Sequence, residues 1–553
     1  MPSITLNRTA FENYVGKKLP LDTMKDRISY LGTDLEDVTD NEIHVEIFPN
    51  RPDMLSVQGF ARAFRSFIGT KTGLSEFTVK ESGEKVIIDE SVKTVRPYTA
   101  CAIVKGLHFD DERIKEVIAI QEKLHITYGR NRKKVAIGIY PYEKIKTPIH
   151  FCAEDPKKIQ FHPLESDKEM TAQEILETHS AGKAYGYLLD SCKKYPLFKD
   201  ANGSILSMPP IINSHTVGKI NEKTKDVFIE CSGFDFRIMK KCLNMIVTAL
   251  ADMGGAIYSM ELDYGKDKYI TPDLQPEEMP LDLEYINKLL GLNLNEKKAQ
   301  QLLEMMGYGY RNKKVLIPSY RADIIHQADL AEDIAIAHGF ENFPAIIPKV
   351  ATVAEEQPIE VFKRNVRESL IGLGFLQASV YMLTNDEFQS TRMNFSKESI
   401  KLANSISSDY DTLRSWTLPA LMEILAVNKH HEFPQSLFAF GTSFAKDMST
   451  DTHVKETETC ALVMSMEQTD YTAIRQVIDY LMRNLDVIGD IAGSIHSSFI
   501  DGRTASLKIG KEEIAVFGEL HPGVLSNWGL EMPTVGCEIN ITALFESKKG
   551  KRH

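Results

Sequence analysis

The segment from Pro318 to Phe343, PSYRADIIHQADLAEDIAIAHGFENF, most constrains how this chain can fold. Asp329, Glu332 and Asp333 stand at positions i, i+3 and i+4, so in a helix the three carboxylates share one face. A second face of the same helix is apolar and carries Leu330, Ile334 and Ala337. The pattern therefore predicts an amphipathic helix with an acidic stripe that the fold has to accommodate.

A fourth carboxylate, Asp323, precedes this helix and stands beside Tyr320 and Arg321, where it can cap the helix or add an oxygen ligand. Carboxylates this close repel one another unless they are protonated, solvated or neutralised, and magnesium is a common neutraliser because it takes oxygen ligands. The plain alternative is an acidic first turn that faces water and is favoured by the helix dipole. Since charged helix faces are commonly just solvated, the spacing alone favours that alternative.

The length of 553 residues predicts three to four domains at about 150 residues each. A hydrophobic content of 43% and a charged content of 26% are typical of a globular protein. No apolar run is long enough for a membrane span, and the first residues lack a signal or transit pattern, so we expect no membrane contact and a cytoplasmic location. Seven scattered cysteines without a CxxC pair predict reduced thiols, with neither a zinc site nor a disulfide framework.

The net charge of −12 argues against a dedicated nucleic-acid binder, because phosphate contacts need clustered lysine and arginine. Two local basic tracts remain as candidates. They are GRNRKK (residues 129–134) and the C-terminal residues Lys548, Lys549, Lys551 and Arg552. On general grounds each is more often a solvated loop or tail than a docking surface.

The fold class that the chain predicts is multidomain α+β. Residues 1–84 suit a small α+β unit, in which SITLN is a strand, Asn7 or Thr9 caps a helix, and Asp53 starts a second helix after the PNRP turn. Residues 85–265 suit a larger mixed α+β domain. A proline-rich, charged linker with a boundary near Ile270 then leads to a helical domain at 272–348, and residues 355–553 suit an antiparallel α+β module.

Two tracts in the second domain stand out, SMPPIINS (Ser207 to Ser214) and DVFIECSGFD (Asp226 to Asp235). Because a Pro-Pro pair cannot lie inside a helix or a central strand, the backbone there is irregular and its polar groups need other partners. Such loops often carry function, and a surface turn is the equally good alternative.

The run YRADIIHQADLAEDIAIAHGFENF, together with PNRPD and SVQGFAR near the N-terminus, resembles the beta subunits of phenylalanyl-tRNA synthetase of the archaeal and eukaryotic type. The resemblance covers essentially the whole chain in the same order. It implies a ligase subunit in an α2β2 assembly, in which the alpha subunit binds ATP and phenylalanine and charges tRNA(Phe). It also implies that magnesium is held near the alpha subunit by Asp323, Asp329, Glu332 and Asp333.

By the same resemblance, residues 85–265 look like the family's editing domain, which hydrolyses tyrosine misattached to tRNA(Phe). Editing is needed because a phenylalanine pocket excludes one extra hydroxyl only modestly. The matching positions are Phe198, Ser207, Glu230 and Ser232. Where archaeal relatives carry an aliphatic residue and an Asp-x-Thr pair, this chain has Phe198 and Glu230-Cys231-Ser232. With no Ser-His-Asp pattern in sight, we expect positioned water rather than a covalent serine.

The C-terminal module resembles a class II synthetase core without its catalytic motifs. No arginine pair of the fRxE type follows the second strand. FGELHPGVL stands where a glycine-rich strand ending in an ATP-binding arginine would be, and Arg414 and Arg503 are isolated. Since the phosphates of ATP need cationic clamps, this module is expected to dimerise with a competent partner rather than to adenylate. Two other interpretations stay open: a stand-alone aminoacyl-tRNA deacylase and a non-enzymatic scaffold subunit.

Overall fold

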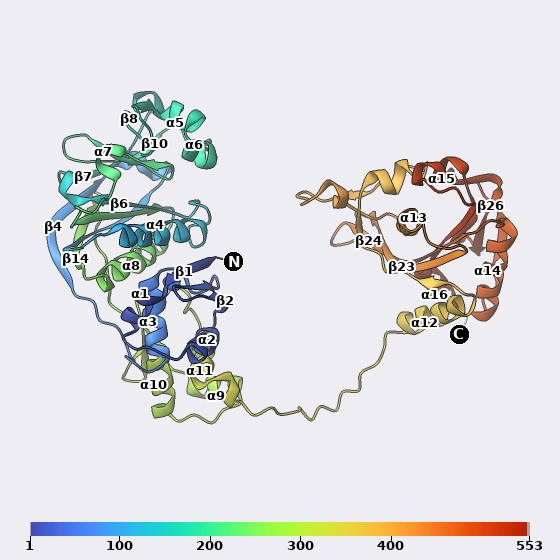
Figure 1. Ribbon diagram of the computed structural model, residues 1–553, viewed down its shortest axis with the longest axis horizontal. Helices are drawn as coiled ribbons and strands as arrows, with labels where there is room; N and C mark the ends of the chain where they lie inside the picture. The colour runs from blue at the N-terminus through green and yellow to red at the C-terminus, as the bar shows by residue number, and fades with distance from the viewer. Residues whose placement is uncertain (1, 550–553) are drawn as a thin grey trace. The chain divides into compact units, whose positions relative to one another are not determined.

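The computed structural model describes residues 2–549, and the chain divides into two compact units, unit 1 (Met1–Ile347) and unit 2 (Pro348–His553) (Figure 1). The structure therefore supports the multidomain α+β prediction, and the finer domain boundaries stay predictions. In the part of the chain that the structure describes, no helix is both long and apolar enough to span a membrane. All seven cysteines are free thiols.

Unit 1 begins with a three-stranded antiparallel sheet in the order β1-β3-β2, formed by β1 (Ser3–Asn7), β2 (Asp34–Val38) and β3 (Glu42–Glu46). Its helices are α1 (Arg8–Val15), α2 (Leu21–Tyr30) and α3 (Val57–Phe67). The side chain of Asn7 accepts a hydrogen bond from the Ala10 amide at 2.9 Å, so α1 begins at one of the two predicted caps. Phe11, Phe60 and Phe64 pack together beneath the sheet.

The start of α3 differs from the prediction. Ser56, rather than Asp53, caps this helix, because its hydroxyl accepts the Gly59 amide at 3.0 Å. Both oxygens of Asp53 instead accept hydrogen bonds from the Arg51 guanidinium, at 2.9 and 2.8 Å. A Cβ at Gly59 would lie 1.9 Å from the Asp53 carbonyl oxygen, so this close approach requires glycine.

The middle of unit 1 is a ten-stranded sheet in the order β12-β11-β10-β7-β4-β14-β5-β13-β6, with β15 paired to β14. The strands are β4 (Val79–Ile88), β5 (Tyr98–Lys105), β6 (Val135–Pro141), β7 (Ile149–Glu154), β10 (Tyr195–Lys199), β11 (Ile205–Met208), β12 (Ile212–Asn213), β13 (Val227–Gly233), β14 (Ala256–Asp263) and β15 (Lys268–Thr271). Most pairs are antiparallel, and β4 runs parallel to both β7 and β14.

Helices α4 (Asp111–Ile126) and α8 (Phe236–Asp252) pack on one face of this sheet. Alternate residues of β5 enter two different cores: Ala100, Ala102 and Val104 face the helices, whereas Cys101 and Ile103 face the opposite core. Short elements cover the β10 to β12 end, namely β8 (Gln160–Phe161), β9 (Met170–Thr171), α5 (Ala172–Thr178), α6 (Ser180–Tyr185) and α7 (His215–Gly218).

The predicted linker around Ile270 proves to be part of the fold. Ile270 lies within β15, which extends the large sheet, and β16 (Glu277–Pro280) joins a second small sheet in the order β16-β18-β17 with β17 (Gly309–Arg311) and β18 (Lys314–Ile317). The prolines and charges mask the strand pattern because edge strands tolerate both. Helices α9 (Leu283–Leu290), α10 (Glu296–Met305) and α11 (Gln327–His338) complete this region. Their core is continuous with that of α3 and α8.

Unit 2 is built on a seven-stranded sheet in the order β19-β23-β24-β28-β27-β26-β25. The strands are β19 (Leu376–Gln377), β23 (Gln435–Lys446), β24 (Val454–Ser465), β25 (Asp490–Gly493), β26 (Phe499–Ile509), β27 (Glu512–Leu520) and β28 (Thr534–Asn540). The predicted antiparallel pattern is found throughout except between β19 and β23, which are parallel.

Helices cover both faces of the unit 2 sheet. One core holds α12 (Pro358–Gly372), α14 (Tyr471–Asn484) and α16 (Ile541–Lys549), and the other holds α13 (Leu418–Val427) and α15 (Pro522–Trp528). A small sheet in the order β20-β22-β21 precedes α13 and consists of β20 (Leu383–Thr384), β21 (Ile400–Lys401) and β22 (Thr412–Leu413). Of the predicted basic tail, Lys548 donates to the Leu485 carbonyl, whereas Lys551 and Arg552 lie outside the described residues.

Candidate functional site

A cavity of about 560 Å³ lies between the two ends of the large sheet in unit 1. These ends, β6 and β12, approach each other, and the Tyr140 hydroxyl donates to Asn213 at 3.4 Å. The walls of the cavity come from α4, β6, β13, the Pro209–Asn213 segment, the start of α6 and the end of α7. Both tracts singled out in the sequence contribute to it, through Ser207 and Glu230. The fold thus brings two of the four predicted editing residues, one from each tract, into one cavity.

Glu230 lies on β13 and is buried in this cavity. Its Oε1 accepts a hydrogen bond from the Tyr140 hydroxyl at 3.1 Å, while its Oε2 is buried without a partner. Gly138, the neighbour of Glu230 on β6, makes room for this pair, since a Cβ there would lie 2.0 Å from the Tyr140 oxygen. Burial raises the pKa of Glu230 to about 7, although Tyr140, Arg96 and Ser232 act in the opposite direction.

Ser207 lies on β11, and its buried hydroxyl is near the Tyr140 hydroxyl but forms no hydrogen bond of good geometry. A hydroxyl can donate one hydrogen bond and accept others, and a carboxylate oxygen can only accept them. Unpartnered buried groups of this kind are costly in a closed interior, so two of them in one cavity indicate a place for a polar ligand group or water.

Ser232 and Phe198 do not line the cavity. Ser232 accepts a bond from Arg96 Nε at 3.1 Å, and its own carbonyl accepts another from the same guanidinium at 2.6 Å. Phe198 pairs with Ser207 between β10 and β11, and its ring stacks on Phe151 with centroids 4.3 Å apart, in the core that also holds Tyr140. Ser232 holds the strand that carries Glu230, and the editing role assigned to both residues stays a prediction.

Three histidines line the same cavity, and none of them was singled out from the sequence. His125 and His179 use both ring nitrogens within the protein. His215 stacks on His162 at 4.5 Å between centroids, and its Nδ1 is buried without a partner. It is the residue directly after the SMPPIINS tract, so extending that tract by one position would have included it.

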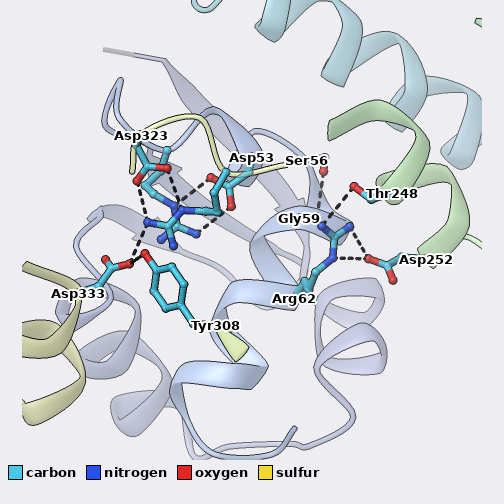
Figure 2. A network of polar contacts seen from close by, with 11 residues as sticks. Asp53, Ser56, Gly59, Arg62, Thr248, Asp252, Tyr308, Asp323 and Asp333 are labelled. Atoms are coloured by element: carbon cyan, nitrogen blue, oxygen red, sulfur yellow. Dashed lines mark hydrogen bonds and ion pairs between the residues drawn. The ribbon is translucent and has the colours of Figure 1, made fainter. Parts of the chain in front are cut away.

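The acidic segment is arranged around an arginine. Arg321, only 2% exposed, donates to both oxygens of Asp323 at 2.8 and 2.7 Å and to Asp333 at 2.9 Å (Figure 2). Asp333 also accepts the Tyr308 hydroxyl. These contacts hold the pKa of Asp323 below its usual range against the opposing effect of burial. The guanidinium therefore neutralises Asp323 and Asp333, which is one of the outcomes that the sequence pattern left open.

The other two carboxylates have different surroundings. Asp329 belongs to the capping of α11, because one of its oxygens accepts the amides of Ile325 and His326, each at 2.7 Å. Glu332 is exposed, and its pKa is raised by partial burial and by the neighbouring Asp333, Asp329 and Asp323. Within residues 2–549, no three acidic, histidine or cysteine side chains are gathered closely enough to hold a metal ion. As arranged, the four carboxylates do not fit a magnesium ligand set, and their assignment as ligands stays a prediction.

The two arginines of unit 2 that were singled out from the sequence also have partners within the protein. Arg414 is buried and donates to the carbonyl oxygens of Thr442 and Tyr381 at 2.7 and 3.2 Å, and its guanidinium packs against Gly441. Arg503 pairs with Glu519 at 2.7 Å. Arg414 is thus engaged inside the fold, whereas the Arg503 side chain is 60% exposed, and the expectation that this module does not adenylate stays a prediction.

Comparison with known proteins gives the chain relatives along its whole length. The phenylalanine–tRNA ligase beta subunit of Pyrococcus abyssi is 38% identical over 556 residues, which cover 99% of this chain and 100% of that protein. The chain belongs to the phenylalanine–tRNA ligase beta subunit family. The corresponding protein of Methanothrix thermoacetophila is 37% identical over 98% of this chain and 100% of its own length.

Two family models match parts of this beta subunit sequence. The tRNA synthetase B5 domain matches residues 279–340, which include the acidic segment, and the phenylalanyl-tRNA synthetase beta chain CLM domain matches residues 343–541. A crystal structure of an N-terminal fragment of the beta subunit from Pyrococcus horikoshii covers 61% of this chain and 99% of the fragment, with a TM-score of 0.59 and 38% identity. The resemblance first seen in short tracts of sequence is confirmed.

Proposed function

We propose that this chain works as the beta subunit of a phenylalanine–tRNA ligase, supports the charging of tRNA(Phe) by an alpha subunit, and hydrolyses tyrosine misattached to that tRNA. The cavity in unit 1 carries the second part of the proposal, because it holds two buried polar atoms that lack partners, Ser207 Oγ and Glu230 Oε2. A tyrosine side chain ends in a hydroxyl that can satisfy both, whereas phenylalanine would leave both unpaired.

The reaction is the hydrolysis of an ester. Water adds to the carbonyl carbon that joins tyrosine to the terminal ribose, the ester carbon–oxygen bond breaks, and the ribose oxygen leaves with a proton. Glu230, when ionised, accepts a hydrogen bond from the phenol, and Ser207 donates one to the phenol oxygen or accepts one from it. Both residues select the substrate in this proposal, and the water attacks without a covalent enzyme intermediate.

The proposed alpha subunit has a candidate surface on unit 2. Large apolar side chains stand exposed in and beside the segments of the small β20-β22-β21 sheet, with Tyr381 at 79% and Ile406 fully exposed, and with Met382 and Tyr410 also in contact with solvent. Apolar groups of this size at one place on a surface favour a protein partner. An α2β2 assembly, with ATP and phenylalanine bound by the alpha subunit, extends this proposal.

The free thiols fit a reducing compartment, which supports placing the protein in the cytoplasm. The occupied arginines of unit 2 support a module that does not adenylate, because the phosphates of ATP need free cationic groups. The stand-alone deacylase and the non-enzymatic scaffold remain the alternatives to this proposal.

The proposal is tested by purifying the chain together with its alpha subunit and measuring two rates, phenylalanine charging and tyrosine release from Tyr-tRNA(Phe). We expect Glu230→Ala to slow tyrosine release by about 5- to 150-fold, the equivalent of one buried partner, and to leave charging intact. Glu177→Ala, which removes an exposed carboxylate of α5 outside the cavity, is the matched control.

The outcomes separate the alternatives. Full tyrosine release by the chain without an alpha subunit would favour the stand-alone deacylase. Release that is unchanged by Glu230→Ala would reject the cavity as the editing site, and no release by the wild-type complex would favour the scaffold.

A further inference from the structure

The loop between α4 and β6, residues 129–134 with the sequence GRNRKK, borders the cavity of unit 1. Arg132 lines the cavity, whereas Arg130 and Lys133 are exposed beside it. Within residues 2–549 neither of these two exposed cations forms an ion pair with a carboxylate. On a protein with a net charge of −12, the loop therefore presents free positive charge next to a candidate active site.

The backbone of this loop is held in an unusual conformation. Three successive residues other than glycine have positive φ, namely Arg130 at 48°, Asn131 at 52° and Arg132 at 64°. Backbone hydrogen bonds to the end of α4 hold these residues in place. The Arg130 amide donates to the Thr127 carbonyl at 2.9 Å, and the Arg132 amide donates to the His125 carbonyl at 3.1 Å. A merely solvated loop has no need for such a conformation, and strained backbone of this kind collects at functional sites.

Arg132 ties the loop to the opposite wall of the cavity. Its guanidinium donates to the carbonyl oxygens of Pro210 and Ile211 at 3.2 and 2.8 Å and to Glu122 at 3.1 Å. The Arg132 side chain thus supplies partners for the irregular Pro-Pro backbone. Its contacts anchor the loop at the cavity wall, and Arg130 and Lys133 belong to the same loop.

An exposed aromatic ring stands beside the Lys133 charge. Tyr187 is 49% exposed, and the Lys133 ammonium lies 5.8 Å from its ring centroid. Tyr185, two residues earlier, supports the Arg132 guanidinium at 4.1 Å. Cationic groups that follow a backbone together with an open aromatic face form the usual surface for single-stranded nucleic acid, in which phosphates meet the charges and bases stack on the ring.

We infer that Arg130, Lys133 and Tyr187, here called the rim cluster, hold the single-stranded 3′ end of the tRNA whose terminal ester enters the cavity. Arg130 and Lys133 contact its phosphates, and one base stacks on Tyr187. The inference rests on the proposed function, because it needs an aminoacyl ester to be delivered to this cavity. It also reverses the interpretation of GRNRKK as a solvated loop, which charge alone had favoured.

Two substrates test the inference in the purified complex with the alpha subunit: Tyr-tRNA(Phe), and the 3′-tyrosyl ester of adenosine, which has no phosphate. The double variant Arg130→Asn with Lys133→Gln removes both charges, and asparagine tolerates the positive φ. We expect its KM for Tyr-tRNA to rise about tenfold at moderate salt, and the slope of log KM against log salt to fall by about 1.4, the value for two phosphates on a single strand. Hydrolysis of the adenosine ester stays unchanged.

Stacking is tested separately. Tyr187→Ala should raise the KM for Tyr-tRNA by roughly fivefold or more, and Tyr187→Phe, which keeps the ring, should restore it. The control Lys157→Gln with Lys158→Gln removes two exposed charges from the same unit outside the cavity and should change neither KM nor the salt slope.

Three results would overturn the inference. If the charge variant behaves like the control on Tyr-tRNA, the rim cluster does not bind RNA. If the variant loses activity equally on the adenosine ester, the loop only maintains the cavity. If the wild-type complex hydrolyses neither ester, the proposed function fails, and this inference fails with it. If the wild type hydrolyses both esters and the charge variant has the same KM and salt slope as the wild type, only the rim cluster is rejected.

Discussion

Glu230 makes the stability of unit 1 depend on pH in a direction opposite to that of most carboxylates. Its pKa is about 7 in the folded protein, because it is buried, and 4.5 in the ordinary state that an unfolded chain provides. Between these values the folded protein keeps a proton that the unfolded chain releases. The contribution of Glu230 to the free energy of unfolding is therefore fully present below pH 4.5 and is lost as the pH rises through 7.

The replacement Glu230→Gln removes this titration and keeps an oxygen that can accept the Tyr140 hydrogen bond. At 1.36 kcal/mol for each pKa unit, the shift corresponds to about 3 kcal/mol. Over the range from pH 4.5 to pH 8, the wild type should lose about 3 kcal/mol of unfolding free energy that the variant does not lose. The difference, variant minus wild type, should therefore rise by about 3 kcal/mol. An exposed control, Glu177→Gln, should show no such pH-dependent difference.

Denaturant unfolding of the full chain, followed by far-UV circular dichroism, measures the effect. The chain offers an internal reference, because its two tryptophans, Trp416 and Trp528, both lie in unit 2. Tryptophan fluorescence should give the same midpoint for wild type and variant at each pH. A difference between the two proteins that does not change with pH would refute the assignment of a raised pKa to Glu230.

Three further predictions concern the acidic segment and unit 2. Arg321→Met should destabilise unit 1 by roughly 3–5 kcal/mol in denaturant melts, because it leaves Asp323 and Asp333 buried without their cation, and a loss below about 1 kcal/mol would contradict the central role of this arginine. A chelator should leave the thermal midpoint of the wild-type chain unchanged, since Arg321 already neutralises Asp323 and Asp333. A chelator-dependent drop that Asp329→Asn abolishes would support the magnesium assignment instead. The pure chain should not catalyse ATP–pyrophosphate exchange, because Arg414 and Arg503 are occupied, and exchange at rates typical of synthetases would show that unit 2 adenylates.

Local features of the fold could be predicted from the sequence because their causes lie within a few residues. The Asn7 cap of α1 is an example. The predicted start of α3 was wrong because Asp53 and Ser56 are both residue types that cap helices well. In the structure Asp53 pairs with Arg51, and Ser56 caps the helix. The sheet order escaped prediction, since β4 pairs with β14 across more than 150 positions of the chain.

The candidate sites show the same division. Ser207 and Glu230 could be singled out by family resemblance, but the Tyr140 contact and the space left by Gly138 depend on the pairing of β6 with β13. For the acidic stripe, the sequence left solvation, protonation and neutralisation by a cation open, and it did not point to an arginine. Arg321 stands two positions before Asp323, and its second contact, to Asp333, exists only because the chain folds back through α11.

The central claim is that the cavity recognises the hydroxyl that distinguishes tyrosine from phenylalanine, and the ratio of kcat/KM for hydrolysis of Tyr-tRNA(Phe) to that of Phe-tRNA(Phe) measures it directly. We expect the wild-type complex to prefer the tyrosyl ester, and Ser207→Ala with Glu230→Ala to reduce the ratio by about 5- to 150-fold, toward one. The Glu177→Ala control should keep the wild-type ratio. A ratio that is the same in wild type and in the double variant would contradict the claim.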